Sequence, residues 1–81
     1  MKVVVLLFAG LRERVGQREM QVEVGEKATV RTLLAQLSAR HPVLAGYPFA
    51  IAVNGEYASQ EGELADGDEV ALIPPVSGGA E

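Results

Sequence analysis

The sequence contains no cysteine, which excludes disulfides, a thiolate nucleophile and any metal or iron–sulfur site built on cysteine ligands. It has a single histidine, His41, without the partner residues that a metal site or a general base requires. Basic residues are outnumbered, with 7 Lys and Arg against 11 Asp and Glu and a net charge of -4. This balance disfavours nucleic acid and anionic membranes as partners, and it fits a partner protein with a basic patch.

Long hydrophobic runs and internal repeats are missing as well. The apolar run "VVVLLF" over 3–8 is short, follows a single lysine and leads quickly into charged residues, which favours a core strand over a signal peptide. We therefore expect a cytoplasmic protein. With 81 residues the chain has room for one domain with a modest core, and no room for a large catalytic cleft of its own.

Hydrophobic periodicity predicts several strands and one main helix. In "REMQVEVG", Met20, Val22 and Val24 alternate with polar residues, as in a half-buried strand. In "ATVRTLLAQLSARHP" the apolar residues recur at helical spacing between Thr29, a suitable N-cap, and Pro42, which stops the helix. The expected elements are a strand over 3–8, a helical turn over 11–16, a strand over 18–24, a helix over 30–41, a loop over 43–48, and strands over 49–53 and 69–73.

This order of elements predicts an α+β roll, in which a mixed four- to five-stranded sheet packs on one main helix. In such rolls the first and last strands usually lie side by side and parallel in the middle of the sheet. The apolar segments near the two ends of the chain suit that position. We expect the folded domain to span 1–73 and a flexible tail with a Gly-Gly motif to span 74–81.

The tail segment "PPVSGG" begins with two conformationally restricted prolines and ends with two glycines, which have no side chain. Pro74 and Pro75 fix two φ angles and remove two N–H donors, so they end the last strand and direct the chain outward. The residues that follow are Val76, Ser77, Gly78 and Gly79. Six extended residues reach roughly 20 Å, and a Gly-Gly end fits a channel too narrow for a Cβ atom. The alternative is a frayed end without a function.

Three stretches of the sequence resemble the small subunits of molybdopterin synthase, a family of ubiquitin-like sulfur carriers. They are "FAGLRERVG" near the start, "VNGE" in the third expected strand and "LADGDEVALIPPVSGG" at the end, in the order found in that family. The last stretch is the most specific, while the middle of the chain is generic. The resemblance implies a ubiquitin-like β-grasp fold, which agrees with the predicted order of elements.

The resemblance also implies that the main-chain carboxyl group of Gly79 is the reactive group, with Gly78 beside it. A partner enzyme would adenylate this carboxylate with ATP and then replace the adenylate with sulfur, because an ionised carboxylate is a poor acyl electrophile. The resulting thiocarboxylate would enter the large synthase subunit, in a heterotetramer, and donate sulfur to cyclic pyranopterin monophosphate in molybdenum cofactor biosynthesis. This chain would bind no cofactor and would have no stand-alone active site.

The chain departs from this family after the glycine pair, because family members commonly end at the second glycine. Here Ala80 and Glu81 follow Gly79. A glutamate at the end would add two negative charges and a Cβ atom to a tail that must enter a narrow channel. We therefore expect a processing protease to remove both residues before activation.

Hydrophobic residues at the positions of Phe8, Tyr57 and Ile73 pack on the large subunit in this family. The resemblance therefore implies that these three residues bind the partner together with the tail segment 74–77, and the alternative is that they belong to the core. The nearby Arg12 and Arg14 are expected to be solvated or paired. They belong to "GLRERVG", which lacks the Lys and Ser/Thr of a phosphate-binding loop.

The acidic stretch "DGDE" at 66–69 is either a divalent-metal site or a solvated turn. Only one pair of its carboxylates is tightly spaced, and its glycine serves a turn, so the turn is favoured and no metal site is expected. This stretch can still contact a basic patch on the activating enzyme.

Several functions share the same fold, because fold does not fix function. A close variant is a sulfur carrier for tRNA thiolation, thiamine synthesis or cysteine synthesis. The fold also suits a ubiquitin-like modifier joined to protein lysines, and it suits a non-catalytic β-grasp binding module. A plain binding module would not need Gly78 and Gly79, and the diproline favours the synthase subunit over the remaining carriers.

Overall fold

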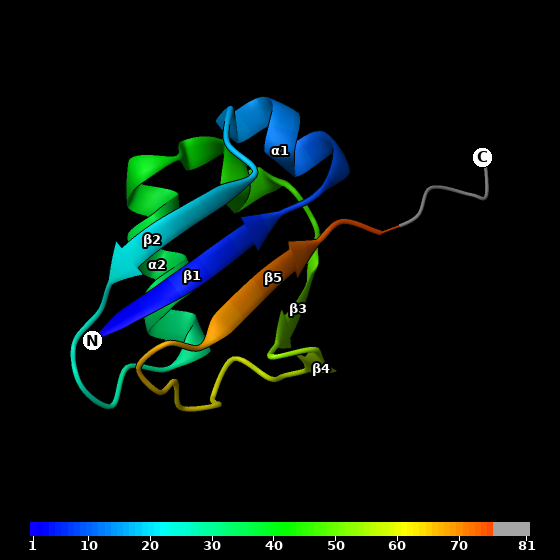
Figure 1. The fold of residues 1–81 in the computed structure, drawn as a ribbon. Coiled ribbons are helices and arrows are strands. Elements are labelled where there is room, and N and C mark those ends of the chain that lie inside the picture. Colours follow the sequence, from blue (N-terminus) through cyan, green and yellow to red (C-terminus); the bar gives the residue numbers. More distant parts are fainter. Residues whose placement is uncertain (76–81) are drawn as a thin grey trace.

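The apolar run near the start of the chain forms the middle of a five-stranded sheet. The computed structural model describes residues 1–75, and in it β1 (Lys2–Leu7) pairs in parallel with β5 (Glu69–Ile73). On its other side β1 pairs antiparallel with β2 (Glu19–Glu23). The central parallel pair predicted from the sequence is therefore confirmed (Figure 1).

The second half of the sheet is built on the other side of β5. Strand β3 (Ala50–Val53) runs antiparallel to β5, and the short β4 (Glu56–Tyr57) pairs antiparallel with β3. The order across the sheet is β2-β1-β5-β3-β4. Asn54 and Gly55 form the turn between β3 and β4 at φ angles of 52° and 87°, the left-handed conformation that makes Asn-Gly a turn signal.

The main helix, α2 (Val30–Arg40), covers one face of the sheet and lies behind it in Figure 1. Thr29 is its N-cap, because the Thr29 hydroxyl oxygen accepts a hydrogen bond from the backbone N–H of Thr32 at 3.2 Å. His41 is the C-cap. The predicted N-cap and the placement of His41 at the end of the helix are both confirmed.

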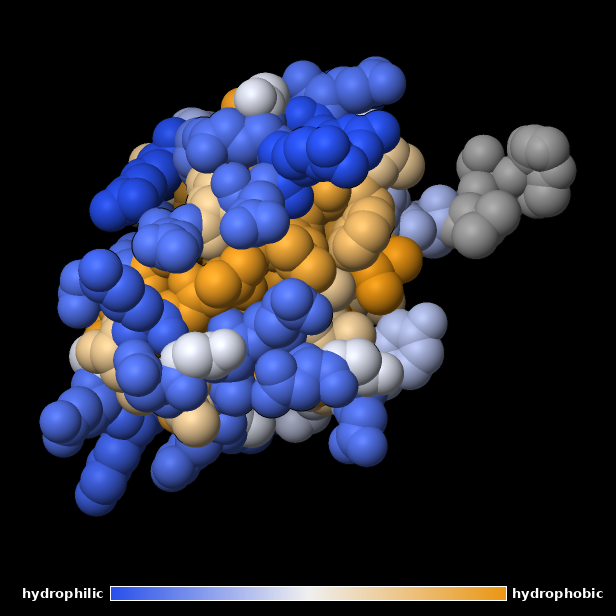
Figure 2. Space-filling model, in the orientation of Figure 1, coloured by the Kyte–Doolittle hydropathy of each residue, from blue (hydrophilic) through white to orange (hydrophobic). Residues whose placement is uncertain are grey.

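Strand alternation divides the sheet into a buried face and an open face. Val3, Val5 and Leu7 of β1 belong to one core cluster with the apolar face of α2. The residues that alternate with them in β1 and β5 are only half-buried: Val4, Leu6, Ala71 and Ile73. Figure 2 shows the open face, on which an apolar band lies between polar rims.

Two connecting segments are more regular than predicted. The segment expected to be a helical turn is an α-helix, α1 (Ala9–Val15), which ends at Gly16 with φ 88°. The segment expected to be a loop contains a 3-10 helix, η1 (Pro42–Gly46). Both helices are too short to be stable alone, and each is held by one leucine in the core, Leu11 and Leu44. No helix in residues 1–75 has the length and apolar character needed to cross a bilayer.

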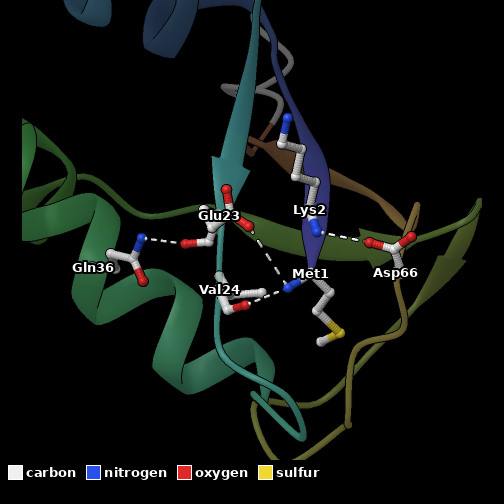
Figure 3. Close-up of polar contacts among 6 residues, drawn as sticks. All are labelled: Met1, Lys2, Glu23, Val24, Gln36 and Asp66. Carbon is white, nitrogen blue, oxygen red and sulfur yellow. Dashed lines mark hydrogen bonds and ion pairs between the residues drawn. The ribbon is translucent and has the colours of Figure 1, made fainter.

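Hydrogen bonds fix the end of the sheet that lies away from the tail (Figure 3). The Asp66 carboxylate accepts a hydrogen bond from the backbone N–H of Lys2 at 2.8 Å. The side-chain amide of Gln36 on α2 donates to the backbone carbonyl of Glu23 at 2.8 Å. The first contact holds the start of β1, and the second ties the helix to the edge strand β2.

The buried contact of α1 predicts a stability effect. Replacing Leu11, which is 0% exposed, by alanine should lower the free energy of unfolding by about 2 to 5 kcal/mol, because it leaves a cavity in the core. Chemical denaturation measures this change. The matched control is Val43→Ala in η1, where the side chain is 36% exposed and the loss should stay below about 1 kcal/mol. Equal losses in the two variants would contradict the role assigned to α1.

Candidate functional site

The tail leaves the sheet from its centre, at the end of β5. Leu72 of β5 pairs with Leu7, the last residue of β1, so the two central strands end at the same edge. Ile73 ends β5, and Pro74 and Pro75 follow it outside the sheet. The other predicted residues of the tail lie outside the described part of the chain: Val76, Ser77, Gly78 and Gly79.

An apolar groove of about 370 Å³ lies beside the root of the tail. We call it the tail-root groove, and its lining residues are Pro48, Phe49, Ala50, Tyr57, Ile73, Pro74 and Pro75. The strand register brings them together, because Ala50 pairs with Ile73 and Ala52 pairs with Tyr57. Alternation along the strands then puts all four of these side chains on the open face. The groove brings Tyr57 and Ile73 together with the diproline, four residues that the family resemblance implies in partner binding.

Phe8 lies on the other side of the tail root from Tyr57 and Ile73. It is the N-cap residue of α1 and lines a second hollow of about 290 Å³. We call this hollow the arginine recess, and its lining residues are Leu6, Leu7, Phe8, Arg12, Arg18 and Glu19. Phe8 and Tyr57 are surface residues, with 43% and 78% of their area exposed. The role of Phe8, Tyr57 and Ile73 in partner binding stays a prediction.

Several residues of this site have no counterpart among the predicted ones. Pro48 and Phe49 line the tail-root groove, although Pro48 was expected in a plain loop and Phe49 as the first residue of the third strand. A signal was present, because Phe49 directly precedes a strand that must pair somewhere in the sheet, but the sequence does not state the register. Arg14 lies over the Tyr47 ring at 5.0 Å, a cation–π contact that agrees with the expectation of a paired arginine.

The acidic stretch at 66–69 is a structural turn. Asp68 accepts hydrogen bonds from the side-chain amide of Asn54 at 2.9 Å and from the backbone N–H of Ala65 at 2.8 Å. The carboxylate of Asp66 is already engaged by the backbone of Lys2. The turn interpretation is therefore confirmed. In residues 1–75 no three His, Cys, Asp or Glu side chains are grouped so that they could hold a metal ion.

The described residues form two hollows around the tail root. Within 1–75 every buried side chain is apolar, so this part of the chain keeps no titratable group in a protected environment. General acid–base chemistry normally relies on such groups. The described residues offer an apolar groove on one side of the tail root and a recess with two arginines on the other.

Comparison with known proteins identifies the family. The model described as "ThiS family" matches residues 5–79. The chain belongs to the ThiS family. It is 45% identical to the molybdopterin synthase sulfur carrier subunit of Chlamydomonas reinhardtii, an alignment that covers 98% of this chain and 100% of the relative. It is also 41% identical to small archaeal modifier protein 1 of Haloferax volcanii, over 90% of this chain and 95% of the relative.

Solved structures confirm the ubiquitin-like β-grasp fold for this ThiS-family chain. The putative molybdopterin converting factor subunit 1 of Pyrococcus furiosus has a TM-score of 0.89 and 37% identity, over 94% of this chain and 99% of that one. The ubiquitin of Caldiarchaeum subterraneum has a TM-score of 0.64 and 22% identity, over 96% of each chain, and shows the likeness in fold alone.

Two further similar structures are complexes with a partner protein. One is the complex of subunits 1 and 2 of the molybdopterin-converting factor of Helicobacter pylori, with a TM-score of 0.64 and 25% identity over 96% of this chain and 99% of that one. The other is the BexX/CysO complex of Amycolatopsis orientalis, with a TM-score of 0.72 and 27% identity over 94% and 98%. Proteins similar to this chain therefore assemble with partner subunits.

Because the groove lies on the open face of the sheet, we expect a substitution in the groove to leave the stability of the core unchanged. Tyr57→Ser should change the free energy of unfolding by less than about 1 kcal/mol, because this side chain is 78% exposed. Leu72→Ala, next to Ile73 but on the buried face at 0% exposure, should cost about 2 to 5 kcal/mol. Urea denaturation followed by circular dichroism compares the two variants. A large loss for Tyr57→Ser would place Tyr57 in the core and contradict the groove.

Proposed function

We propose that this protein is the sulfur carrier subunit of a molybdopterin synthase. The single observation that supports this most strongly is the 45% identity to such a subunit along nearly the whole chain. The family match also extends to residue 79, so it includes the glycine pair on which a carrier depends. The groove at the tail root offers an apolar surface next to the segment that must be handed to a partner.

The chemistry centres on the acyl group of Gly79 and takes place on partner proteins. The carboxylate oxygen of Gly79 attacks the α-phosphorus of ATP in an adenylating enzyme, and pyrophosphate leaves. A persulfide then attacks the acyl carbon and AMP leaves, which gives an acyl disulfide. A thiol attacks the donor's sulfur in that disulfide, so the thiocarboxylate is released and the thiol and the donor end as a disulfide. Adenylation is needed because the free carboxylate is ionised at neutral pH and resists nucleophilic attack.

The second half of the reaction belongs to the large synthase subunit. There the sulfur of the thiocarboxylate attacks cyclic pyranopterin monophosphate, which is the route to the dithiolene of the molybdenum cofactor. Water then cleaves the acyl–sulfur bond, so the sulfur stays on the pterin and Gly79 leaves as a carboxylate. The six residues 74–79 span roughly 20 Å when extended, enough to reach into a neighbouring subunit while the domain stays docked. We place the tail-root groove and Phe8 against the large subunit during this step.

Ala80 and Glu81 follow Gly79 in this chain, so Gly79 has no free carboxyl group while they are attached. A peptide bond cannot be adenylated by ATP in the way a carboxylate is. A protease that cleaves after Gly79 therefore has to act before the adenylating enzyme. The adenylating enzyme consumes ATP, and this chain itself binds no cofactor. Cleavage after Gly79 and adenylation both fit the cytoplasmic location expected from the sequence.

Thiocarboxylate formation is the direct test. A chain that ends at Gly79, mixed with the adenylating enzyme, ATP, a persulfide sulfur donor and a thiol reductant, should gain the mass that corresponds to replacing one oxygen by sulfur. The full chain of 81 residues should gain nothing under the same conditions, because its Gly79 is still in a peptide bond. Intact-mass spectrometry reads both results. Absence of the mass change in the trimmed chain would refute the proposal.

Docking of the large subunit is tested at Ile73. The side chain of Ile73 is half-buried on the open face and lines the tail-root groove, so Ile73→Asp should leave the fold intact and weaken the complex by on the order of a hundredfold. Titration calorimetry with the purified large subunit measures the affinity. Val4→Asp, a half-buried position of the open face outside the groove, is the matched control and should bind normally. Normal binding by Ile73→Asp would remove the groove from the interface.

A second candidate function is a ubiquitin-like protein modifier. The observation that favours it is the 41% identity to small archaeal modifier protein 1. A modifier transfers the same adenylated acyl group to a lysine amine, so the product is an isopeptide bond and AMP leaves. Because the chain has no Lys or Arg between Arg40 and Gly79, trypsin would leave the whole segment that ends at Gly79 on a modified lysine. Mass spectrometry of conjugates from the native host should find this branched peptide if this function is the correct one.

A further inference from the structure

The end of the molecule from which the tail leaves is rich in arginine, although the whole chain is acidic. Arg12 and Arg14 come from α1, and Arg18 lies next to the end of β1, because the backbone N–H of Leu7 donates to the Arg18 carbonyl oxygen at 3.0 Å. The opposite end carries acidic groups that include Asp66 and Asp68. Although the net charge is -4, these arginines therefore lie at one end of the strands and these acidic groups at the other.

The arginine recess combines cationic side chains with an apolar floor. Leu7 is buried, Leu6 is half-buried and Phe8 is 43% exposed, while Arg12 and Arg18 are exposed at the rim. The recess lies toward β1 and β2, and the tail-root groove lies on the other side of β5, toward β3 and β4. The two hollows therefore flank the root of the tail, so one partner surface at the tail root can contact both.

The two guanidinium groups of the recess are not occupied by carboxylates of the described chain. The ion pairs of residues 1–75 join Arg31 to Glu61 and the terminal ammonium group to Glu23, both away from the recess. Glu19 lines the same hollow but forms no ion pair with either arginine. Positive charge is therefore available there in a chain whose overall charge is negative.

We propose that the arginine recess receives an acidic side chain of the large subunit, which lands between Arg12 and Arg18 and over Phe8. A guanidinium group binds a carboxylate through two parallel hydrogen bonds, and arginine and aromatic residues are both enriched at protein interfaces. This inference rests on the proposed function, because it names how the same partner is oriented.

A protein carboxylate fits the recess better than a free phosphate or a nucleotide does. A small polar anion gains nothing from the apolar floor of Leu6 and Phe8, and Glu19 at the rim repels a multiply charged ion. A carboxylate on a protein surface is brought in together with apolar neighbours that cover this floor. The acidic far end of the molecule would then point away from the partner, so the charge separation also orients the encounter.

The test compares two double variants with the same loss of charge. Arg12→Gln/Arg18→Gln removes the cations of the recess, and Lys2→Gln/Lys27→Gln removes two exposed cations remote from it. Binding of each to the purified large subunit is measured by stopped-flow mixing at several salt concentrations. We expect the arginine variant to bind on the order of tenfold to a hundredfold more weakly. Its association rate should also depend less on salt, while the lysine variant should match the unaltered chain.

Each result other than the expected one has a defined meaning. Equal affinity of the two double variants would show that the recess does not bind the large subunit and would overturn the inference. Competition by millimolar inorganic phosphate would show that the recess is a phosphate site and would overturn it as well. Thermal unfolding checks that the arginine variant is folded. If it is not, the single variants Arg12→Gln and Arg18→Gln replace it, and normal binding by both overturns the inference. Failure of the unaltered chain to bind the large subunit would instead refute the proposed function, and this inference with it.

Discussion

The parallel pairing of β1 with β5 is the contact on which the rest of the structure depends. It joins the first and last strands of the chain, so the sheet is complete only when the two ends of the domain meet. Its inward side chains, such as Val5 and Val70, are fully buried at the centre of the core. Parallel strands also end at the same edge, and for this reason the tail starts beside Phe8 and α1 and not at a remote corner.

Short-range signals were sufficient to predict much of the fold. The cap at Thr29, the helical spacing of Leu33 and Leu37 and the turn at Asn54 each act over a few residues, so they can be read from the sequence. Helix α1 was underestimated because its stability comes from Leu11 in the core and not from its own sequence.

The candidate site was harder to predict than the fold, because it depends on strand register. Tyr57 and Ile73 were named from a family resemblance and the diproline from the residues of the tail, but Phe49, which lines the same groove, was missed. Its place in the groove follows from the pairing of Ala50 with Ile73, two residues that are far apart in the sequence. The functional roles of Gly78 and Gly79 rest on the sequence and on the family match, since they lie outside the described residues.

The edge strand β2 has a consequence for the behaviour of the protein at high concentration. Its outer backbone groups are an available template for another strand, and such edges often lead to aggregation. Glu19 and Glu23 stand exposed at the two ends of this strand. Two copies that met there in antiparallel fashion would bring glutamates opposite each other, and the repulsion would keep the molecules apart. The acidic side chains of this margin thus disfavour pairing of two copies along β2.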